Sequence, residues 1–376
     1  MAAANNSSIC TSLNTLVLTA PEEASAWLYT QWETIFYLSL FISIFTIGVI
    51  NNFVFFYMLA RVPRMQTVVN MYLAHLAVAD TVSLVVNIIY YAFGILNSPI
   101  KENLPFRFKY TCVLMYGPAF LTYYASVVII TLVTFDRYLA VCFPIRHRLL
   151  KPKRLAVKAL SVTWLLSIIP ATFSTLRFAR QAELCIKWPR RDFYQNLPQT
   201  MSLCIPLVPD TDINLIGMNV FLVFGFVIML VNIIMYGGII TALNPKNRTG
   251  TMGTGTTMTR ETLVRNQVAR MLVIAGTFFF IFQLPLRCYT IGNIVRILGG
   301  KPVLSSRQHY MLVVIGRISL LINSSTNSFI YGFTSEYYRK CFFEAFRRRS
   351  VTNHANRRPK RVKTSSVSGR LAALRR

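Results

Sequence analysis

The sequence alternates long apolar runs with short polar segments. A helix needs about 20 apolar residues to cross a hydrocarbon core roughly 30 Å thick. Seven runs reach that length, so the pattern predicts an all-α membrane protein built as a seven-transmembrane helix bundle. The third run contains no charged residue. The expected spans are residues 35–59, 65–96, 110–135, 159–176, 213–244, 271–294 and 308–333.

Composition agrees with this pattern. Hydrophobic residues make up 54% of the 376-residue chain, and charged residues only 14%. That balance leaves too little charge to cover a soluble protein of this length and is typical of a multispan membrane protein. The net charge of +27 does not indicate nucleic-acid binding, because the basic residues lie between and after the apolar runs.

The basic residues also predict the orientation of the bundle. Most of the 40 Lys and Arg residues fall in alternate connecting segments and after the seventh run, which the positive-inside rule assigns to the cytoplasm. The chain then divides into an extracellular N-terminal tail (1–33), the bundle (34–334), an amphipathic juxtamembrane helix (335–349) and a basic disordered cytoplasmic tail (350–376). The amphipathic helix is expected on the inner leaflet, with its basic side facing anionic lipid.

Cysteines on the outer side predict a covalent link. Cys112 begins the third span at its outer end, and the second outer loop offers Cys185 and Cys204. An oxidising compartment favours a bridge between that span and that loop, with Cys204 as the preferred partner of Cys112. Cys10 and Cys185 are available for a second bridge, although the sequence leaves the connectivity open.

Other chemistry in the sequence is limited. Overlapping sequons at Asn5 and Asn6 predict glycosylation, and Cys341 in the juxtamembrane segment is a candidate for lipidation. The seven cysteines and four histidines show no metal-ligand spacing, and there is no glycine-rich phosphate loop. The sequence therefore predicts neither an enzyme nor a metal-binding protein.

Ionisable residues inside the spans are candidates for function, because an ion is costly in the bilayer. Asp80 is the only acid deep in any predicted span, and Asp136-Arg137-Tyr138 stands at the inner end of the third span. An Arg–Asp pair at the membrane edge is partly desolvated, so a small movement can break it, as a two-state switch requires. The alternative is a helix-end anchor that snorkels to the lipid headgroups.

Seven motifs, each on its own span, appear in the order found in one receptor family. The chain from residue 34 to residue 347 resembles a class A (rhodopsin-like) G-protein-coupled receptor. The motif residues are Asn52, Leu76 to Asp80, Cys112 with Asp136-Arg137-Tyr138, Trp164, Tyr236, Pro285, and Asn327 to Tyr331.

The resemblance implies roles for these residues. Asp136 would hold Arg137 in the inactive form, and Arg137 would meet the Gα subunit of a heterotrimeric G protein when the sixth helix swings out. Tyr236 and Tyr331 would support the active form. The tail, which contains Ser and Thr, would serve an arrestin and a receptor kinase, and the receptor would lie in the plasma membrane.

The resemblance also implies a sodium pocket, the one cofactor-like site expected. Its residues would be Asp80, Ser126, Asn323 and Asn327, whose oxygens can coordinate a small hard cation. The alternative is a water-filled polar network without a specific ion.

The ligand class follows from the outer half of the bundle. Ala119 replaces the aspartate of amine receptors, and Leu321 replaces the lysine that retinal requires in opsins. Arg287 and Arg317, which would both face the outer cavity, make the chain most like thyrotropin-releasing-hormone receptors and related neuropeptide receptors. That likeness implies a short, C-terminally amidated peptide ligand and a Gq-type G protein. Otherwise the two arginines would snorkel, or would pair with the acids at positions 210 and 212.

Several positions depart from that family. Phe120 and Tyr124 replace a tyrosine and an asparagine that bind ligand, and Leu286 replaces a tyrosine, so the tripeptide hormone itself is disfavoured. The other departures lie in the helices that move. Ile228 and Ser328 replace prolines, and Gln283 replaces the toggle tryptophan of the sixth helix.

The departures leave two alternatives to a peptide receptor. Without these two prolines, the fifth and seventh helices should be straighter locally. The sequence therefore does not predict how strongly the receptor signals without ligand. A constitutively active or lipid-type orphan receptor therefore stays an alternative. A seven-span ion transporter is less favoured, because it would need several protonatable groups across the bilayer.

Overall fold

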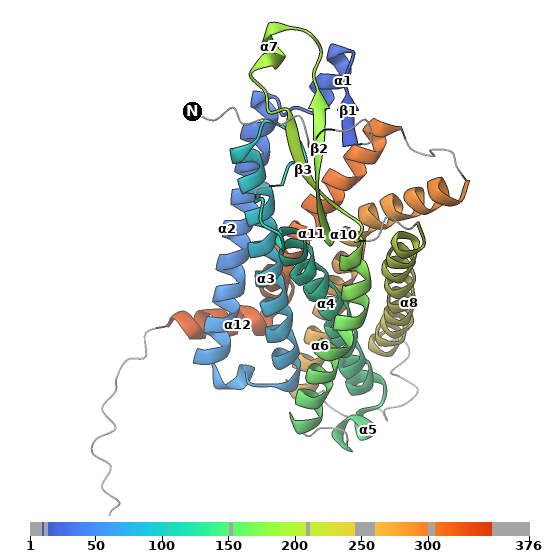
Figure 1. The fold of residues 1–376 in the computed structure, drawn as a ribbon. Helices are drawn as coiled ribbons and strands as arrows, with labels where there is room; N and C mark the ends of the chain where they lie inside the picture. Colours follow the sequence, from blue (N-terminus) through green and yellow to red (C-terminus); the bar gives the residue numbers. More distant parts are fainter. Residues whose placement is uncertain are drawn as a thin grey trace, which may run out of the picture. The chain divides into compact units, whose positions relative to one another are not determined.

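The computed structural model describes residue 10 and residues 14–104, 106–149, 153–207, 211–244, 260–299 and 305–347 (Figure 1). Seven long helices lie in this described part, one at each predicted span, which confirms the seven-helix bundle. Each helix extends beyond its apolar run, most clearly the sixth. The helices are α2 (Gln31–Arg61), α3 (Val68–Asn97), α4 (Thr111–Cys142), α6 (Lys153–Leu176), α8 (Thr211–Leu243), α10 (Arg260–Gly299) and α11 (Ser306–Thr334).

Large apolar side chains are exposed on the sides of the bundle, and a number of polar side chains are buried inside it. Large apolar side chains such as Phe53, Leu165 and Ile234 are exposed on its outer surface. Polar side chains such as Asn52 and Asn232 are buried between the helices. This arrangement suits a surface that faces lipid, where buried polar groups find partners only in neighbouring helices.

Six of the seven helices are long and apolar enough to cross a membrane. The exception is α11, which has 29 residues but a less apolar sequence. It carries Arg317 and the run Asn323-Ser324-Ser325, and these side chains point toward the other helices rather than toward lipid. The interior position of its polar face explains why this span is less hydrophobic.

A three-stranded sheet covers the end of the bundle that the loop charges predict to be extracellular, which we call the outer end. β2 (Arg180–Lys187) and β3 (Thr200–Ile205) form an antiparallel hairpin within the second outer loop, and β1 (Thr15–Val17) pairs with β2 in parallel (Figure 1). The short helices α1 (Pro21–Ala26) and α7 (Asp192–Gln195) lie at the same end. The sequence predicts a polar N-terminal tail here, whereas its described part is a strand and a helix.

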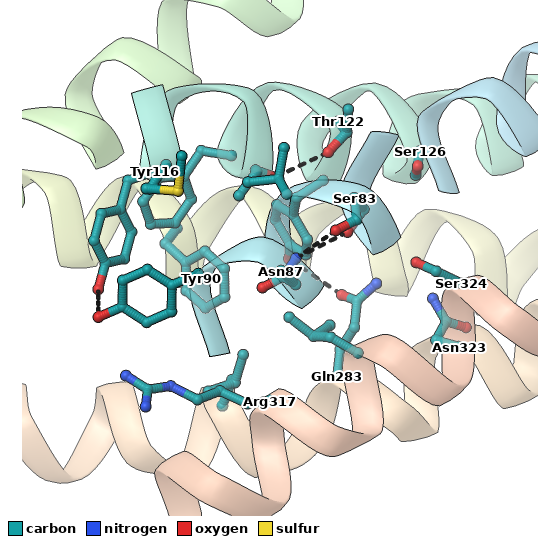
Figure 2. A pocket seen from close by; sticks show the side chains of 18 of the residues that line it. Ser83, Asn87, Tyr90, Tyr116, Thr122, Ser126, Gln283, Arg317, Asn323 and Ser324 are labelled. Atoms are coloured by element: carbon teal, nitrogen blue, oxygen red, sulfur yellow. Dashed lines mark hydrogen bonds between the residues drawn. The ribbon is translucent and has the colours of Figure 1, made fainter. Parts of the chain in front are cut away.

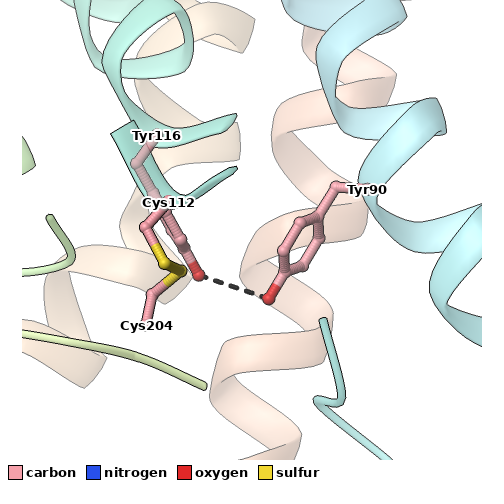
Figure 3. Close-up of a disulfide and its surroundings, with 4 residues drawn as sticks. All are labelled: Tyr90, Cys112, Tyr116 and Cys204. Atoms are coloured by element: carbon pink, nitrogen blue, oxygen red, sulfur yellow. Dashed lines mark hydrogen bonds between the residues drawn. A yellow bond between two sulfur atoms is a disulfide. The ribbon is translucent and has the colours of Figure 1, made fainter. Parts of the chain in front are cut away.

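Two disulfides hold this sheet in place. Cys112, at the outer end of α4, is bonded to Cys204 of β3, the partner that the sequence favours (Figure 3). Cys10 is bonded to Cys185 of β2, with 5.8 Å between the Cα atoms. Cross-links that close such long loops restrict the unfolded chain most, so both should stabilise the outer cap. The sequons at Asn5 and Asn6 lie outside the described residues.

In the described part of the chain, the inner end of the bundle carries three short helices: η3 (Pro63–Met65), α5 (Pro144–Leu149) and α12 (Glu336–Phe346). The last of these is the expected juxtamembrane helix. The Tyr338 hydroxyl donates a hydrogen bond to the buried Asn70 side chain of α3, and Arg64 forms a 2.6 Å ion pair with Glu344. The predicted tail 350–376 lies outside the described residues.

Cys341 does not suit its predicted role as a lipidation site. Its side chain is completely buried on the inner face of α12, beside Tyr338. Burial also raises the pKa of the Cys341 thiol, so little of the nucleophilic thiolate is present. The structure therefore corrects this prediction, because one face of an amphipathic helix packs on the bundle and Cys341 falls on that face.

Candidate ligand cavity and signalling switch

A cavity of about 220 Å³ opens between the helices beneath the outer cap (Figure 2). Its upper part is aromatic. The Tyr90 and Tyr116 hydroxyls are 3.4 Å apart (Figure 3). The Tyr116 ring stacks on Phe178 with centroids 4.4 Å apart. Tyr116 is one helical turn from Cys112, so the disulfide fixes this wall. The floor is polar and is formed by Asp80, Ser126, Asn323 and Ser324.

Four of the six predicted ligand-binding residues line this cavity. They are Ala119, Phe120, Leu286 and Arg317. They come from α4, α10 and α11, three helices that the sequence could order but not place in space. A cavity lined by apolar and aromatic side chains with a few convergent polar groups is the usual form of a small-ligand site.

Arg317 is held by an acid that the sequence analysis missed. Its two terminal nitrogens donate to the two carboxylate oxygens of Glu102, at 2.5 and 3.0 Å, and its guanidinium lies 5.2 Å from the Tyr91 ring centroid. Glu102 adopts a left-handed backbone conformation with φ of 66°. The first outer loop therefore supplies the counter-ion of Arg317, in place of the acids at positions 210 and 212.

Arg287 lies behind the cavity wall, not in it. Its side chain is only 1% exposed, and one terminal nitrogen donates to the Gln283 side-chain oxygen at 2.7 Å and to the Tyr123 hydroxyl at 3.2 Å. The missing side chain of Gly225 on α8 makes this burial possible, since a Cβ there would lie 1.8 Å from the guanidinium. The expected direct access of Arg287 to the cavity is therefore corrected.

Tyr124 does not line the cavity either, although the sequence predicts it as a ligand-binding residue. It is completely buried, and its hydroxyl lies 2.7 Å from the Ser174 hydroxyl of α6. Tyr123 lines the cavity in its place and donates to the Gln283 oxygen at 3.1 Å. Adjacent residues of a helix point about 100° apart, so an error of one position moves a side chain from the cavity to a helix interface.

The predicted sodium-pocket residues come together at the floor. Asp80 accepts a 2.8 Å hydrogen bond from the Asn327 side chain, while Ser126 and Asn323 line the cavity near it (Figure 2). A buried carboxylate with neighbouring hydroxyl and amide oxygens is a donor set that fits a small hard cation. The ion itself stays a prediction.

Polar contacts between helices extend to Ser328, the residue that replaces a proline in the seventh helix. The Ser328 hydroxyl of α11 donates to the Asn52 side-chain oxygen of α2 at 3.3 Å, and the Asn52 amide donates to Thr81 of α3 at 3.2 Å. Asn52 is almost completely buried. Ser328 therefore contributes to a link among three helices, a contact that proline could not make.

At the inner end, Arg137 is paired with its neighbour. The Arg137 guanidinium donates twice to one Asp136 oxygen, at 2.5 and 3.0 Å. The other Asp136 oxygen lies 3.1 Å from Nε2 of His147 in α5, a partner that the sequence analysis did not identify. The arrangement matches the resting state that the family resemblance implies, with the acid holding the arginine.

The other predicted switch residues surround this pair. Tyr236 is buried, and its hydroxyl accepts from Thr134 at 3.3 Å. Tyr331 is buried against the rings of Phe55 and Tyr338. Tyr138 packs on Phe143 at the end of α4. Their roles in the active form stay predictions.

The family model of the 7 transmembrane receptor (rhodopsin family) matches residues 51–331. The chain belongs to this family. The receptor is therefore a membrane-spanning signalling protein and not an enzyme. Among the described residues there is no cluster of acids, histidines and cysteines that could hold a metal ion.

Similar curated receptors are peptide receptors. The chain is 24% identical to the galanin receptor 2a of Danio rerio over 326 residues, covering 84% of this chain and 78% of that one. It is 24% identical to the somatostatin receptor type 5 of Rattus norvegicus (81% and 75% covered). It is also 24% identical to the thyrotropin-releasing hormone receptor of Gallus gallus (79% and 74% covered).

Proposed function

We propose that this receptor binds a short, C-terminally amidated peptide in the aromatic cavity and activates a heterotrimeric G protein, of Gq type, through Arg137. The observation that carries the proposal is the position of Arg317 in the cavity wall. There the cation lies beside aromatic rings that line the same cavity. The names of the similar receptors specify galanin, somatostatin and thyrotropin-releasing hormone, which supports a peptide ligand.

The proposal includes a location in the plasma membrane with the N-terminus outside. The two disulfides lie at the end of the bundle that carries the N-terminal strand, which suits the oxidising side of the membrane. The segments at the opposite end are rich in Lys and Arg, as the positive-inside rule requires of cytoplasmic segments. That end would also contact anionic lipid, an arrestin and a receptor kinase.

A screen of short peptide amides on cells that express the receptor tests the proposal, with calcium release as the readout. Active peptides should lose potency at least tenfold on Arg317→Ala, because a charge-assisted hydrogen bond contributes about 1.5–3 kcal/mol. Arg137→Ala should abolish the response without changing peptide binding. Unchanged potency on Arg317→Ala would place the peptide outside this cavity.

A second candidate, constitutive activity, is favoured by one observation. Gln283 occupies the toggle position and is engaged by Tyr123 and Arg287 instead of packing as a large aromatic side chain. A receptor of this kind would signal in cells without added peptide. Nucleotide exchange on purified Gα in the absence of any peptide, lost on Arg137→Ala, would support it.

A further inference from the structure

We infer that Arg177 forms an anion-binding subsite in the cavity and selects peptides that carry an acidic side chain. Arg177 follows directly after α6, at the outer end of the bundle, and none of the motifs or predicted site residues includes it. The inference rests on the proposed function, because it assigns a chemical preference to the ligand of the same cavity.

The charged side chains that line the cavity do not all have a partner of their own. Among the described residues, the charged side chains in its lining are Asp80, Arg177 and Arg317. Arg317 already shares both carboxylate oxygens of Glu102, and Asp80 is at the floor with Asn327. None of the ion pairs in the described part of the chain includes Arg177, so its positive charge is available to a ligand.

Burial makes this charge costly. Arg177 is only 9% exposed, and burial lowers the pKa of its guanidinium, with neighbouring tyrosines as the groups that oppose this shift. A buried cation without a counter-ion has lost much of its hydration and has gained little in return. A ligand carboxylate would supply the missing counter-ion in a place where water screens the attraction weakly.

The guanidinium is also oriented for such a ligand. Its Nε donates to the Asn214 side-chain oxygen of α8 at 3.0 Å, and its carbon lies 5.1 Å from the centroid of the Phe178 ring. These contacts fix the plane of the group, and among the described residues no acceptor contacts its two terminal nitrogens. Two parallel N–H groups are the donor geometry that a carboxylate accepts with both oxygens.

A glycine on α8 provides the space that the Arg177 stem needs. A Cβ at Gly217 would lie 2.5 Å from Cδ and 2.7 Å from Cγ of Arg177. Because α8 passes so closely, the arginine lies along the helix surface within the cavity wall instead of extending into solvent. Arg177 is thus built into the wall, unlike Arg180 of β2, which is exposed three residues later.

The first experiment measures binding to the subsite without any agonist. Purified full-length receptor is heated in N-acetyl-glutamate α-amide or in N-acetyl-glutamine α-amide, at equal concentration and ionic strength. The acidic probe should raise the midpoint of thermal unfolding more than its neutral analogue in the wild type, because a ligand that binds only the folded state stabilises it. Arg177→Gln should remove this difference, while Arg180→Gln should keep it.

The second experiment uses the peptide-amide library, synthesised in pairs that differ only by Glu against Gln or Asp against Asn. At the wild-type receptor the best pairs should favour the acid by about ten- to hundredfold in potency, as expected for a charge-assisted bidentate contact. Arg177→Gln should reduce this ratio to near one. Arg177→Lys keeps the charge but not the two parallel donors, so the preference should fall to severalfold, and this variant serves if the Gln variant does not reach the cell surface.

The outcomes separate the two proposals. Active peptides that show no acid preference, together with equal effects of the two small probes on the wild type, would overturn the subsite and leave the peptide-receptor function standing. If no library peptide signals while the acidic probe still stabilises the receptor through Arg177, the subsite holds and the proposed function fails. A preference that survives Arg177→Gln assigns the anion site to another residue and overturns the inference.

Discussion

Two arginines at opposite ends of the bundle are held in different ways. Arg137, near the inner end, is balanced by Asp136, which also contacts His147. Arg287, in the outer half, is buried and has no acid as a partner in the described part of the chain; its hydrogen bonds go to the neutral oxygens of Gln283 and Tyr123. The first arrangement can be released by a small movement, whereas the second fixes a helix through hydrogen bonds that are hard to replace.

The Asp136 contacts predict the effect of its removal. Asp136→Asn replaces an ion pair with a hydrogen bond from the charged Arg137 to a neutral acceptor, which weakens the interaction that holds Arg137 by about 1–3 kcal/mol. Basal G-protein signalling should rise at least severalfold at equal surface expression. His147→Gln, which leaves the Arg137 pair intact, should raise it less. Wild-type basal signalling in Asp136→Asn would show that this pair does not restrain the receptor.

The network around Gln283 predicts a non-additive pair of variants. Gln283→Leu leaves the buried Arg287 with the Tyr123 hydroxyl alone and should destabilise the receptor by about 1–3 kcal/mol. The double variant Gln283→Leu/Arg287→Met removes both polar partners and should recover part of that loss. Thermal unfolding of the purified receptors measures both. A double variant less stable than either single one would contradict this account.

At the scale of elements, α12 is attached to the bundle at a few defined points. The Tyr338 hydroxyl reaches the buried side chain of Asn70, and Asn70 in turn donates to the Met65 carbonyl at 2.7 Å. Tyr337 donates to the Arg64 carbonyl at 2.8 Å, in a more exposed position. The helix is thus positioned by polar contacts as well as by its apolar face.

Tyr338→Phe should therefore loosen α12. The change leaves the Asn70 oxygen buried without this donor, at a cost of about 1–3 kcal/mol, and amide hydrogen exchange across 336–346 should accelerate. Tyr337→Phe is the matched control and should have a smaller effect, because water can replace its exposed contact. Equal exchange in both variants would mean that apolar packing alone holds the helix.

At the scale of the whole molecule, one ion pair joins the first outer loop to α11. Glu102 and Arg317 are 215 positions apart in the chain, and their side chains are still partly exposed. The pair joins this loop to Arg317, which lines the cavity. A peptide that binds Arg317 must share or displace Glu102, so the same contact affects both stability and ligand entry.

A charge exchange tests this connection. Glu102→Arg or Arg317→Glu alone places like charges together and should lower the free energy of unfolding by about 1–2 kcal/mol. The exchanged double variant should regain most of that loss, as the purified receptors would show in thermal unfolding. Strictly additive losses would mean that the pair contributes no coupling energy.

Much of the architecture is a local property of the chain. Seven apolar runs of spanning length give seven helices, because in lipid a backbone must satisfy its hydrogen bonds within the helix. The amphipathic pattern after the seventh run gives α12, whose apolar face packs on the bundle. The pairing of Asp136 with Arg137 could be predicted because these residues are adjacent in the chain. Cys204 was favoured as the partner of Cys112 because an oxidising compartment favours a bridge between the third span and the loop that contains Cys204.

The tertiary structure decided the contacts between distant residues. It paired Arg317 with Glu102, buried Arg287 against Gly225, turned Tyr124 toward α6 and packed Cys341 on the bundle. Each of these contacts depends on how the helices are rotated and on how closely segments far apart in the sequence approach each other. A hydrophobic pattern does not determine the rotation or the approach with an accuracy of one residue. By itself the sequence determined that the chain forms these helices and that they span a membrane. The packing of those helices decided which charges face the cavity and which are already neutralised there.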